Sequence, residues 1–269
     1  MQIAISTAAL QAATPRAVQR AADLGFTSIE INLQPDEFDY SARRRPNARF
    51  YRELKTQLTS LGLSVWSVTL PPLNQAQMFS PRARKDILLN AAGAAGILGA
   101  AVFVAEPAHI FHDEDALERY LRENHAPPVV PGFDESWAQV VNRRMTYALP
   151  NMEVWLGAPL TNQADRMAKI TFDLGIGWAM DVRAALQRNN LATWLPAAGE
   201  RLAVAYLYDA PEANAAPQPP LAAEWGEWLP ALARTRLKAV VLRGQPTHDD
   251  DTFRASRAFV ARCLQGTNH

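Results

Sequence analysis

Short apolar stretches alternate along this chain with longer stretches in which apolar residues recur at helical spacing. The first apolar stretch, residues 2–6, is followed by Thr14-Pro15, a helix-start signal, and by a helical pattern over 17–24 that ends at Gly25. The same unit then repeats with a period of roughly thirty residues, with Gly or Pro at the joints. This rhythm predicts parallel strands joined by crossover helices.

Eight stretches fit the strand part of this unit. They are residues 2–6, 26–33, 63–70, 100–105, 145–149, an apolar run that ends at Asp181, 201–207 and 237–242. Helical patterns cover 48–61, 81–98, 112–124, 134–144, 225–235 and 250–264. Eight strand and helix units in one chain predict an α/β fold, a single-domain (β/α)8 TIM barrel over 1–269, with its site at the carboxyl ends of the strands.

Polar side chains stand at two of these strand ends. An apolar run ends directly before Asp181, and Arg183 follows two residues later. This is typical of a buried parallel strand whose end opens onto a polar mouth, so we expect Asp181 in any active site. In the second strand, Glu30 and Asn32 are two residues apart and therefore share a face. Trp178, three residues before Asp181, should face the opposite way and pack against a helix.

The composition limits the classes of partner and ligand that the protein is expected to bind. The 27 Lys and Arg balance the 27 Asp and Glu, so no overall field attracts nucleic acid. Cys263 is the only cysteine, which excludes an intrachain disulfide and a cysteine-based zinc cluster. Neither a signal peptide nor an apolar run long enough to cross a bilayer is present in the sequence. We expect a cytoplasmic protein without a membrane partner, and a homo-oligomer remains open.

Residues 107–133 lengthen one connection between strand and helix. This segment contains Pro127, Pro128 and Pro131. Extra length at such a connection usually lies over the pocket, so we expect a lid here. The acidic run Asp249-Asp250-Asp251, in contrast, is typical of a helix N-terminus.

Five segments resemble the xylose isomerase-like TIM barrels, the superfamily of sugar phosphate isomerases and epimerases. They are IAIST (3–7), ADLGFTSIEI (22–31), 58–67, 148–157 and 177–185. The resemblance implies a divalent metal (Mn, Mg or Zn), held by a Glu ending strand five, an Asp and a His around strand six, a His near strand seven and a Glu ending strand eight. Such a metal would polarise a sugar hydroxyl or carbonyl.

Matched residue by residue, only one metal ligand of that pattern remains. Asp181 takes the place of the family Asp, whereas Pro150 stands at the strand-five Glu, Ala184 at the strand-six His, Tyr206 at the strand-seven His and Arg243 at the strand-eight Glu. Proline and alanine offer no ligand, and arginine keeps its proton. We therefore expect no cofactor at the usual positions, and the resemblance supports the fold more than the activity.

Two interpretations of Arg243 remain open. In the first, the fixed guanidinium of Arg243, with Arg183 nearby in sequence, replaces the positive charge of the metal and binds an anion such as a sugar phosphate or sugar acid. Alternatively, Arg243 pairs with Asp181 or Glu153 as a structural ion pair. A metal, if present, would need a site rebuilt from Glu106, His109 and Asp181.

The candidate site residues follow from these arguments. The proposed proton carriers are Asp181, Glu106 and Glu153. The proposed substrate-binding residues are Arg243, Arg183, Glu30, Asn32, Trp155, Tyr206, Asn151 and His109.

Two functions compete. One is an isomerase- or epimerase-type proton transfer on a small sugar-like substrate, without the usual metal. The other is an inactive barrel that serves as a binding or partner protein. The apurinic-site endonucleases of the same superfamily need a multi-histidine metal cluster and a basic surface, and the sequence has neither.

Overall fold

Eight parallel strands close into a barrel in which each strand pairs with its neighbour in the sequence and β8 pairs with β1. The computed structural model describes residues 1–10, 13–34, 47–70, 81–104, 146–150, 168, 177–187, 190–210 and 215–265. The strands are β1 (Gln2–Ser6), β2 (Ser28–Asn32), β3 (Ser64–Thr69), β4 (Val102–Val104), β5 (Thr146–Pro150), β6 (Gly177–Asp181), β7 (Leu202–Leu207) and β8 (Ala239–Leu242). The prediction of a single-domain (β/α)8 barrel is confirmed.

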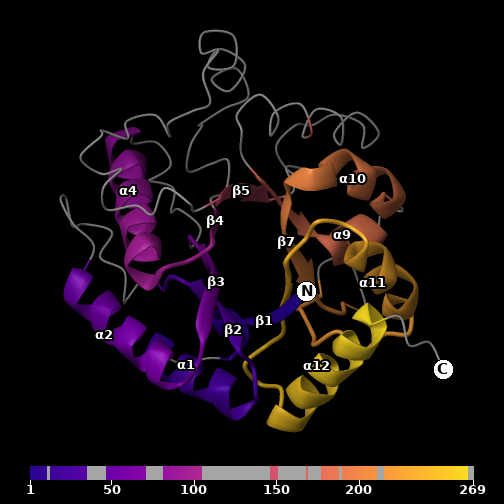
Figure 1. The fold of residues 1–269 in the computed structure, drawn as a ribbon, viewed down its shortest axis with the longest axis horizontal. Helices are drawn as coiled ribbons and strands as arrows, with labels where there is room; N and C mark the ends of the chain where they lie inside the picture. Colours follow the sequence, from indigo (N-terminus) through magenta and orange to yellow (C-terminus); the bar gives the residue numbers. More distant parts are fainter. Residues whose placement is uncertain are drawn as a thin grey trace, which may run out of the picture.

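Helices surround the ring of strands (Figure 1). They are α1 (Thr14–Asp23), α2 (Ala48–Ser60), α4 (Pro81–Leu98), α9 (Val182–Gln187), α10 (Leu191–Ala198), α11 (Trp225–Ala233) and α12 (Asp250–Leu264), with short 3-10 helices at Thr7–Ala9 and Gly199–Arg201. None of the helices within the described ranges is both long and apolar enough to cross a membrane.

The observed N-caps show whether the helix starts predicted from the sequence are correct. The acidic run is the start of α12, as predicted, because the Asp249 carboxylate accepts a hydrogen bond of 2.7 Å from the Thr252 backbone N–H. Thr14-Pro15 does mark a helix start, although Thr14 is not the N-cap: Ala13 is the N-cap of α1, and Thr14 and Pro15 belong to its first turn. The second helix is capped by the Asn47 side chain, which accepts from the Phe50 N–H at 3.2 Å.

The core has two layers, one between strands and helices and one inside the barrel. Ile29 and Ile31 of β2 belong to the outer layer, so Glu30 between them faces the interior. Trp178 is also outside, where its ring packs at 5.6 Å from that of Trp194, as predicted. The inner layer consists mainly of small and branched side chains together with one tyrosine: Ala4, Val102, Val104, Ala179, Val204, Tyr206 and Val241.

A β-bulge in β3 sets the register at the site. Ile29 pairs with Val65, but the next residue, Glu30, pairs with Ser67, so Trp66 is the extra residue. The bulge therefore places Ser67 beside Glu30. The predicted lid at 107–133 lies outside the described residues.

Candidate functional site

Polar side chains on or just after five strands meet near the carboxyl-terminal rim of the barrel. They are Glu30 on β2, Ser67 on β3, Asp181 at the end of β6, Tyr206 and Tyr208 on and just after β7, and Arg243 just after β8. Parallel strands all end at one rim, which is why residues far apart in the sequence converge here.

Glu30 is the deepest member of this group, with a side chain that is 0% exposed. Its Oε2 accepts two hydrogen bonds, from the Ser67 hydroxyl at 2.9 Å and from the Tyr206 hydroxyl at 3.0 Å. Its Oε1 is buried and has no hydrogen-bond partner in the described part of the chain. A buried carboxylate oxygen without a donor is costly, so Glu30 retains capacity to accept one more hydrogen bond.

Tyr206 fills the centre of the rim and is only 2% exposed. Burial raises the pKa of Tyr206 well above its usual value, and the negative charge of Glu30 raises it further. The phenol therefore stays neutral and donates a hydrogen bond to Glu30.

Arg243 lies against the face of the Tyr206 ring, with Cζ 3.6 Å from the ring centroid. Burial acts to lower the pKa of Arg243, but the attraction of Tyr206, Glu30, Asp181 and Tyr208 together outweighs burial and raises it. The guanidinium makes no hydrogen bond or ion pair with any residue that the structure describes, and only the Arg243 backbone N–H is bonded, to Leu207 O at 2.9 Å. The rim thus holds a charged, half-buried group whose side-chain donors have no partner among the described residues.

Asp181 is anchored on both oxygens. Its Oδ1 accepts from the Ala184 backbone N–H at 2.9 Å, which caps the start of α9, and its Oδ2 accepts from the Tyr208 hydroxyl at 3.0 Å. Burial raises the pKa of Tyr208, and the charge and hydrogen bond of Asp181 raise it further. The predicted alternative, an ion pair between Arg243 and Asp181, does not occur among the described side chains.

Arg183 and Asn32, both predicted to bind substrate, make other contacts. Arg183 donates to the Ala210 carbonyl at 2.9 Å and forms an ion pair with Glu224, so it holds the segment that follows β7. The Asn32 backbone N–H donates to the Thr7 hydroxyl at 2.8 Å. Among the described residues, neither side chain makes a hydrogen bond or ion pair with Glu30, Tyr206 or Arg243.

Five predicted site residues lie outside the described residues: Glu106, His109, Asn151, Glu153 and Trp155. Two members of the group were not among the predicted site residues. Ser67 depends on the bulge, which leaves no sequence signal. Tyr208 could have been found, since it follows Tyr206 by two residues and so continues the inward face of β7.

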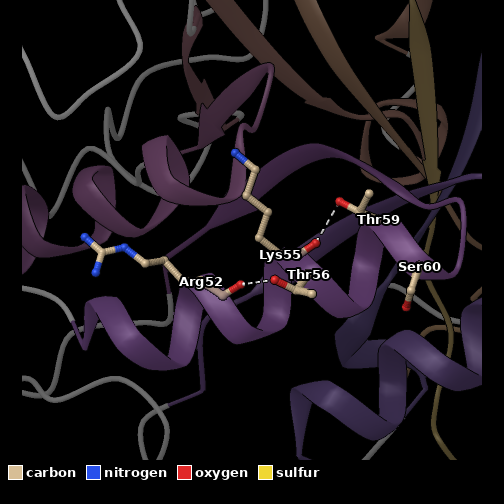
Figure 2. Close-up of a pocket in the computed structure, with 5 residues that line it drawn as sticks. All are labelled: Arg52, Lys55, Thr56, Thr59 and Ser60. Carbon is tan, nitrogen blue, oxygen red and sulfur yellow. Dashed lines mark hydrogen bonds between the residues drawn. The ribbon is translucent and has the colours of Figure 1, made fainter.

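A shallow groove on the outer face of α2 is a separate feature (Figure 2). It is lined by Arg52, Lys55, Thr56, Thr59 and Ser60, all exposed. Its hydrogen bonds are internal to the helix: the Thr56 hydroxyl donates to Arg52 O at 3.0 Å and the Thr59 hydroxyl to Lys55 O at 2.9 Å. No buried polar group points into the groove among the side chains described, so the rim remains the candidate site.

The described residues do not fit the metal that the family resemblance implies. Asp181 is the one ligand type at its expected position, and both of its oxygens already accept hydrogen bonds. By the resemblance, Tyr206 and Arg243 would take the positions of a coordinating histidine and glutamate, and in the structure the two side chains stack on one another. Within the described ranges, no group of three or more His, Cys, Asp or Glu side chains could hold a metal.

Comparisons with known proteins show which solved structures have a similar fold. No protein-family model matches the sequence, and no curated protein gives a significant match. D-psicose 3-epimerase from Clostridium cellulolyticum H10 has a similar structure, with a TM-score of 0.68 and 15% identity over 98% of this chain and 99% of that chain. A 3-keto-D-glucoside 4-epimerase from E. coli matches with a TM-score of 0.64 and 13% identity, over 98% of this chain and 100% of that chain.

A third protein of similar structure is named for a different reaction, a dehydration. The probable 3-DHS dehydratase involved in petrobactin synthesis from Bacillus anthracis matches with a TM-score of 0.61 and 12% identity over 100% of both chains. One fold thus hosts several reactions, and at these identities the likeness concerns the fold. The chain has the xylose isomerase-like TIM barrel fold that sugar epimerases and isomerases share.

Proposed function

We propose that the rim of this barrel binds a small sugar-like molecule, a sugar, sugar phosphate or sugar acid, through Arg243 rather than through a metal ion. The observation that carries the proposal is the Arg243 guanidinium, which is charged, lies 3.6 Å from the Tyr206 ring centroid and donates no hydrogen bond to any residue that the structure describes. A planar guanidinium matches the paired oxygens of a carboxylate or phosphate better than any other side chain.

The neighbours of Arg243 favour a ligand that also carries hydroxyl groups. Glu30 and Asp181 are close enough to contribute to the pKa of Arg243, and both are acceptors. A ligand oxygen that accepts from Arg243 and a ligand hydroxyl that donates to a carboxylate would satisfy both kinds of group. Sugars and sugar acids combine these groups on adjacent carbons.

This arrangement suits an isomerase- or epimerase-type proton transfer. Arg243 would stabilise the oxyanion that develops when a proton leaves the carbon next to a carbonyl group. Asp181, Glu106 and Glu153 are the proposed proton carriers. Two proteins of similar structure, a D-psicose 3-epimerase and a 3-keto-D-glucoside 4-epimerase, are sugar epimerases, which supports this reaction class.

A second candidate, a binding protein without catalysis, is favoured by a separate observation. Tyr206 is buried in the inner layer of the barrel, and both Asp181 oxygens are already hydrogen-bonded. An enzyme needs a carboxylate or histidine that is free to exchange a proton with its substrate.

Calorimetric titration with D-fructose, D-fructose 6-phosphate and D-gluconate tests the proposal. We expect saturable binding of at least one of them by the wild type, and affinity about tenfold or more lower in Arg243→Ala, because a charge-assisted hydrogen-bond donor is lost. Arg52→Ala, in the outer groove, is the matched control and should bind as the wild type does. Equal binding by wild type and Arg243→Ala, or no binding of any of the three, would overturn the proposal.

Proton exchange separates the two candidates. With a ligand that binds, an enzyme should incorporate deuterium from heavy water at a carbon of the sugar, which NMR detects. Binding without exchange would favour the non-catalytic barrel.

A further inference from the structure

We propose that Glu30 is a positioning residue that fixes the Arg243 guanidinium through Tyr206; the inference rests on the proposed role of Arg243 in binding. The three side chains come from β2, β7 and the end of β8, and they form a continuous series of contacts from the buried interior to the rim. Strands β2 and β7 are not neighbours, so the hydrogen bond between Glu30 and Tyr206 spans the interior of the barrel.

The first half of the series restrains the tyrosine ring. The Tyr206 hydroxyl donates to Glu30 Oε2 at 3.0 Å, and Ser67 donates to the same oxygen at 2.9 Å. Glu30 is fully buried, so its carboxylate cannot turn toward solvent. A ring tied at its hydroxyl end to a fixed acceptor presents one face in one orientation.

The second half transmits this restraint to the cation. Arg243 Cζ lies 3.6 Å from the ring centroid, well within the range of a cation–π interaction. A carboxylate that accepts a hydrogen bond from the phenol polarises its O–H bond and leaves the ring richer in electron density. The negative face of the ring then attracts the guanidinium more strongly, and the burial of Glu30 and Tyr206 increases the effect because the local dielectric constant is low.

The consequence is a guanidinium held in place before any ligand arrives. Arg243 needs no hydrogen bond to keep its orientation, so its donors stay available. A ligand that binds a preorganised donor loses less side-chain entropy than one that must order a flexible arginine.

Three variants test the successive contacts from Glu30 through Tyr206 to Arg243. Tyr206→Phe keeps the ring and removes the hydroxyl, Glu30→Gln keeps the shape and removes the charge, and Ser67→Ala removes one donor to Glu30 without touching Tyr206 or Arg243. The readout is the Nε–H signal of Arg243 in the NMR spectrum of the ligand-free protein, assigned by its loss in Arg243→Lys. Its ring-induced shift and its exchange with water report on stacking, and a purely structural role for Glu30 would not move them.

We expect faster exchange with water and a smaller ring-induced shift in Tyr206→Phe and Glu30→Gln, and a weaker change of the same sign in Ser67→Ala. If Glu30→Gln fails to fold, Ser67→Ala and Tyr206→Phe still decide. An Arg243 signal unchanged in the variants that fold would overturn the inference.

Ligand affinity supplies the second readout. With whichever of D-fructose, D-fructose 6-phosphate and D-gluconate binds, Tyr206→Phe should weaken binding about three- to tenfold, less than Arg243→Ala does. If the Arg243 signal responds as expected but none of the three compounds binds, the positioning role stands and the proposed function fails. A changed Arg243 signal with affinity equal to the wild type would overturn the role of Glu30 in binding.

Discussion

The Tyr208 hydroxyl donates a hydrogen bond of 3.0 Å to Asp181 Oδ2 and so joins the ends of two adjacent strands, β6 and β7. The other oxygen of Asp181 accepts from the Ala184 N–H at the start of α9. One carboxylate therefore ties two strand ends to a helix start, which gives Asp181 a structural role whether or not it also carries a proton.

Replacing Asp181 should separate these roles. Asp181→Ala loses both hydrogen bonds, and we expect the free energy of unfolding to fall by about 1–3 kcal/mol. Asp181→Asn keeps an oxygen for the Ala184 N–H, so its loss should be smaller. Urea denaturation measures both. Equal stability of wild type and Asp181→Ala would contradict the anchoring role, and lost proton exchange in a stable Asp181→Asn would add a catalytic one.

Stability at alkaline pH should depend on the two rim tyrosines. The pKa values of Tyr206 and Tyr208 are raised in the folded state above about 10, the value in an unfolded chain. The stabilisation is fully present below pH about 10 and is lost as the pH rises through the folded-state values, because unfolded chains then release protons that the folded chain retains. We expect the free energy of unfolding to fall steeply above pH about 10.

The matched variant is Tyr206→Phe, which removes one of these ionisations. Its unfolding free energy should decline less steeply with alkaline pH than that of the wild type, as measured by urea denaturation at a series of pH values. Parallel declines in the two proteins would show that Tyr206 ionises as readily in the folded state as in the unfolded chain.

The segment after β7 should loosen when its anchors are removed. Asp209 accepts from the Leu221 N–H at 2.6 Å, the Ala222 N–H at 2.8 Å and the Trp225 indole N–H at 2.6 Å, whereas Arg183 holds the segment through Ala210 O and Glu224. We expect faster amide hydrogen exchange over 215–225 in Asp209→Ala, and a smaller increase in Arg183→Ala.

Exchange in α2, on the other side of the barrel, should stay unchanged in both variants and serves as the internal control. A larger effect from Arg183→Ala than from Asp209→Ala would reverse the order of importance that the hydrogen bonds indicate.

Two glycines with positive φ offer a matched pair for stability. Gly25 (φ 77°) and Gly62 (φ 68°) both follow the end of a helix, but only at Gly25 would an added Cβ meet a neighbour, at 2.8 Å from Arg257 Nη1. Either substitution by alanine should cost about 1 kcal/mol or more for the left-handed backbone. Because Arg257 is flexible, we expect Gly25→Ala to cost only slightly more than Gly62→Ala in thermal unfolding. A clearly larger cost at Gly25 would show that the contact with Arg257 is rigid.

The barrel could be predicted because each of its units has a local signal. Apolar runs mark the strands, and signals such as Asp249 and Gly25 mark helix ends. The alternation in β2 also predicted that Glu30 shares a face with Asn32, away from Ile29 and Ile31, and both isoleucines do lie in the outer layer. Each of these signals depends only on residues that are close together in the sequence, so it can be recognised without the structure.

The contacts of the site could not be predicted in the same way. Ser67 reaches Glu30 only because of the bulge at Trp66, and Tyr206 reaches Glu30 across the interior from a strand that is not its neighbour. Both contacts depend on register and barrel closure. Arg183 follows Asp181 by two residues, yet α9 begins at Val182, so the helix turn carries its side chain toward Glu224 instead.

The central claim is that Arg243, stacked on Tyr206, organises this rim in the place where related barrels are expected to hold a metal. Elemental analysis of the purified full chain, with melting temperatures measured with and without added manganese, magnesium and zinc, tests it most directly. The account predicts less than stoichiometric metal and no rise in melting temperature. Stoichiometric metal, or a clear rise on adding one of the ions, would contradict it and would indicate a rebuilt site that includes residues such as Glu106, His109 and Asp181.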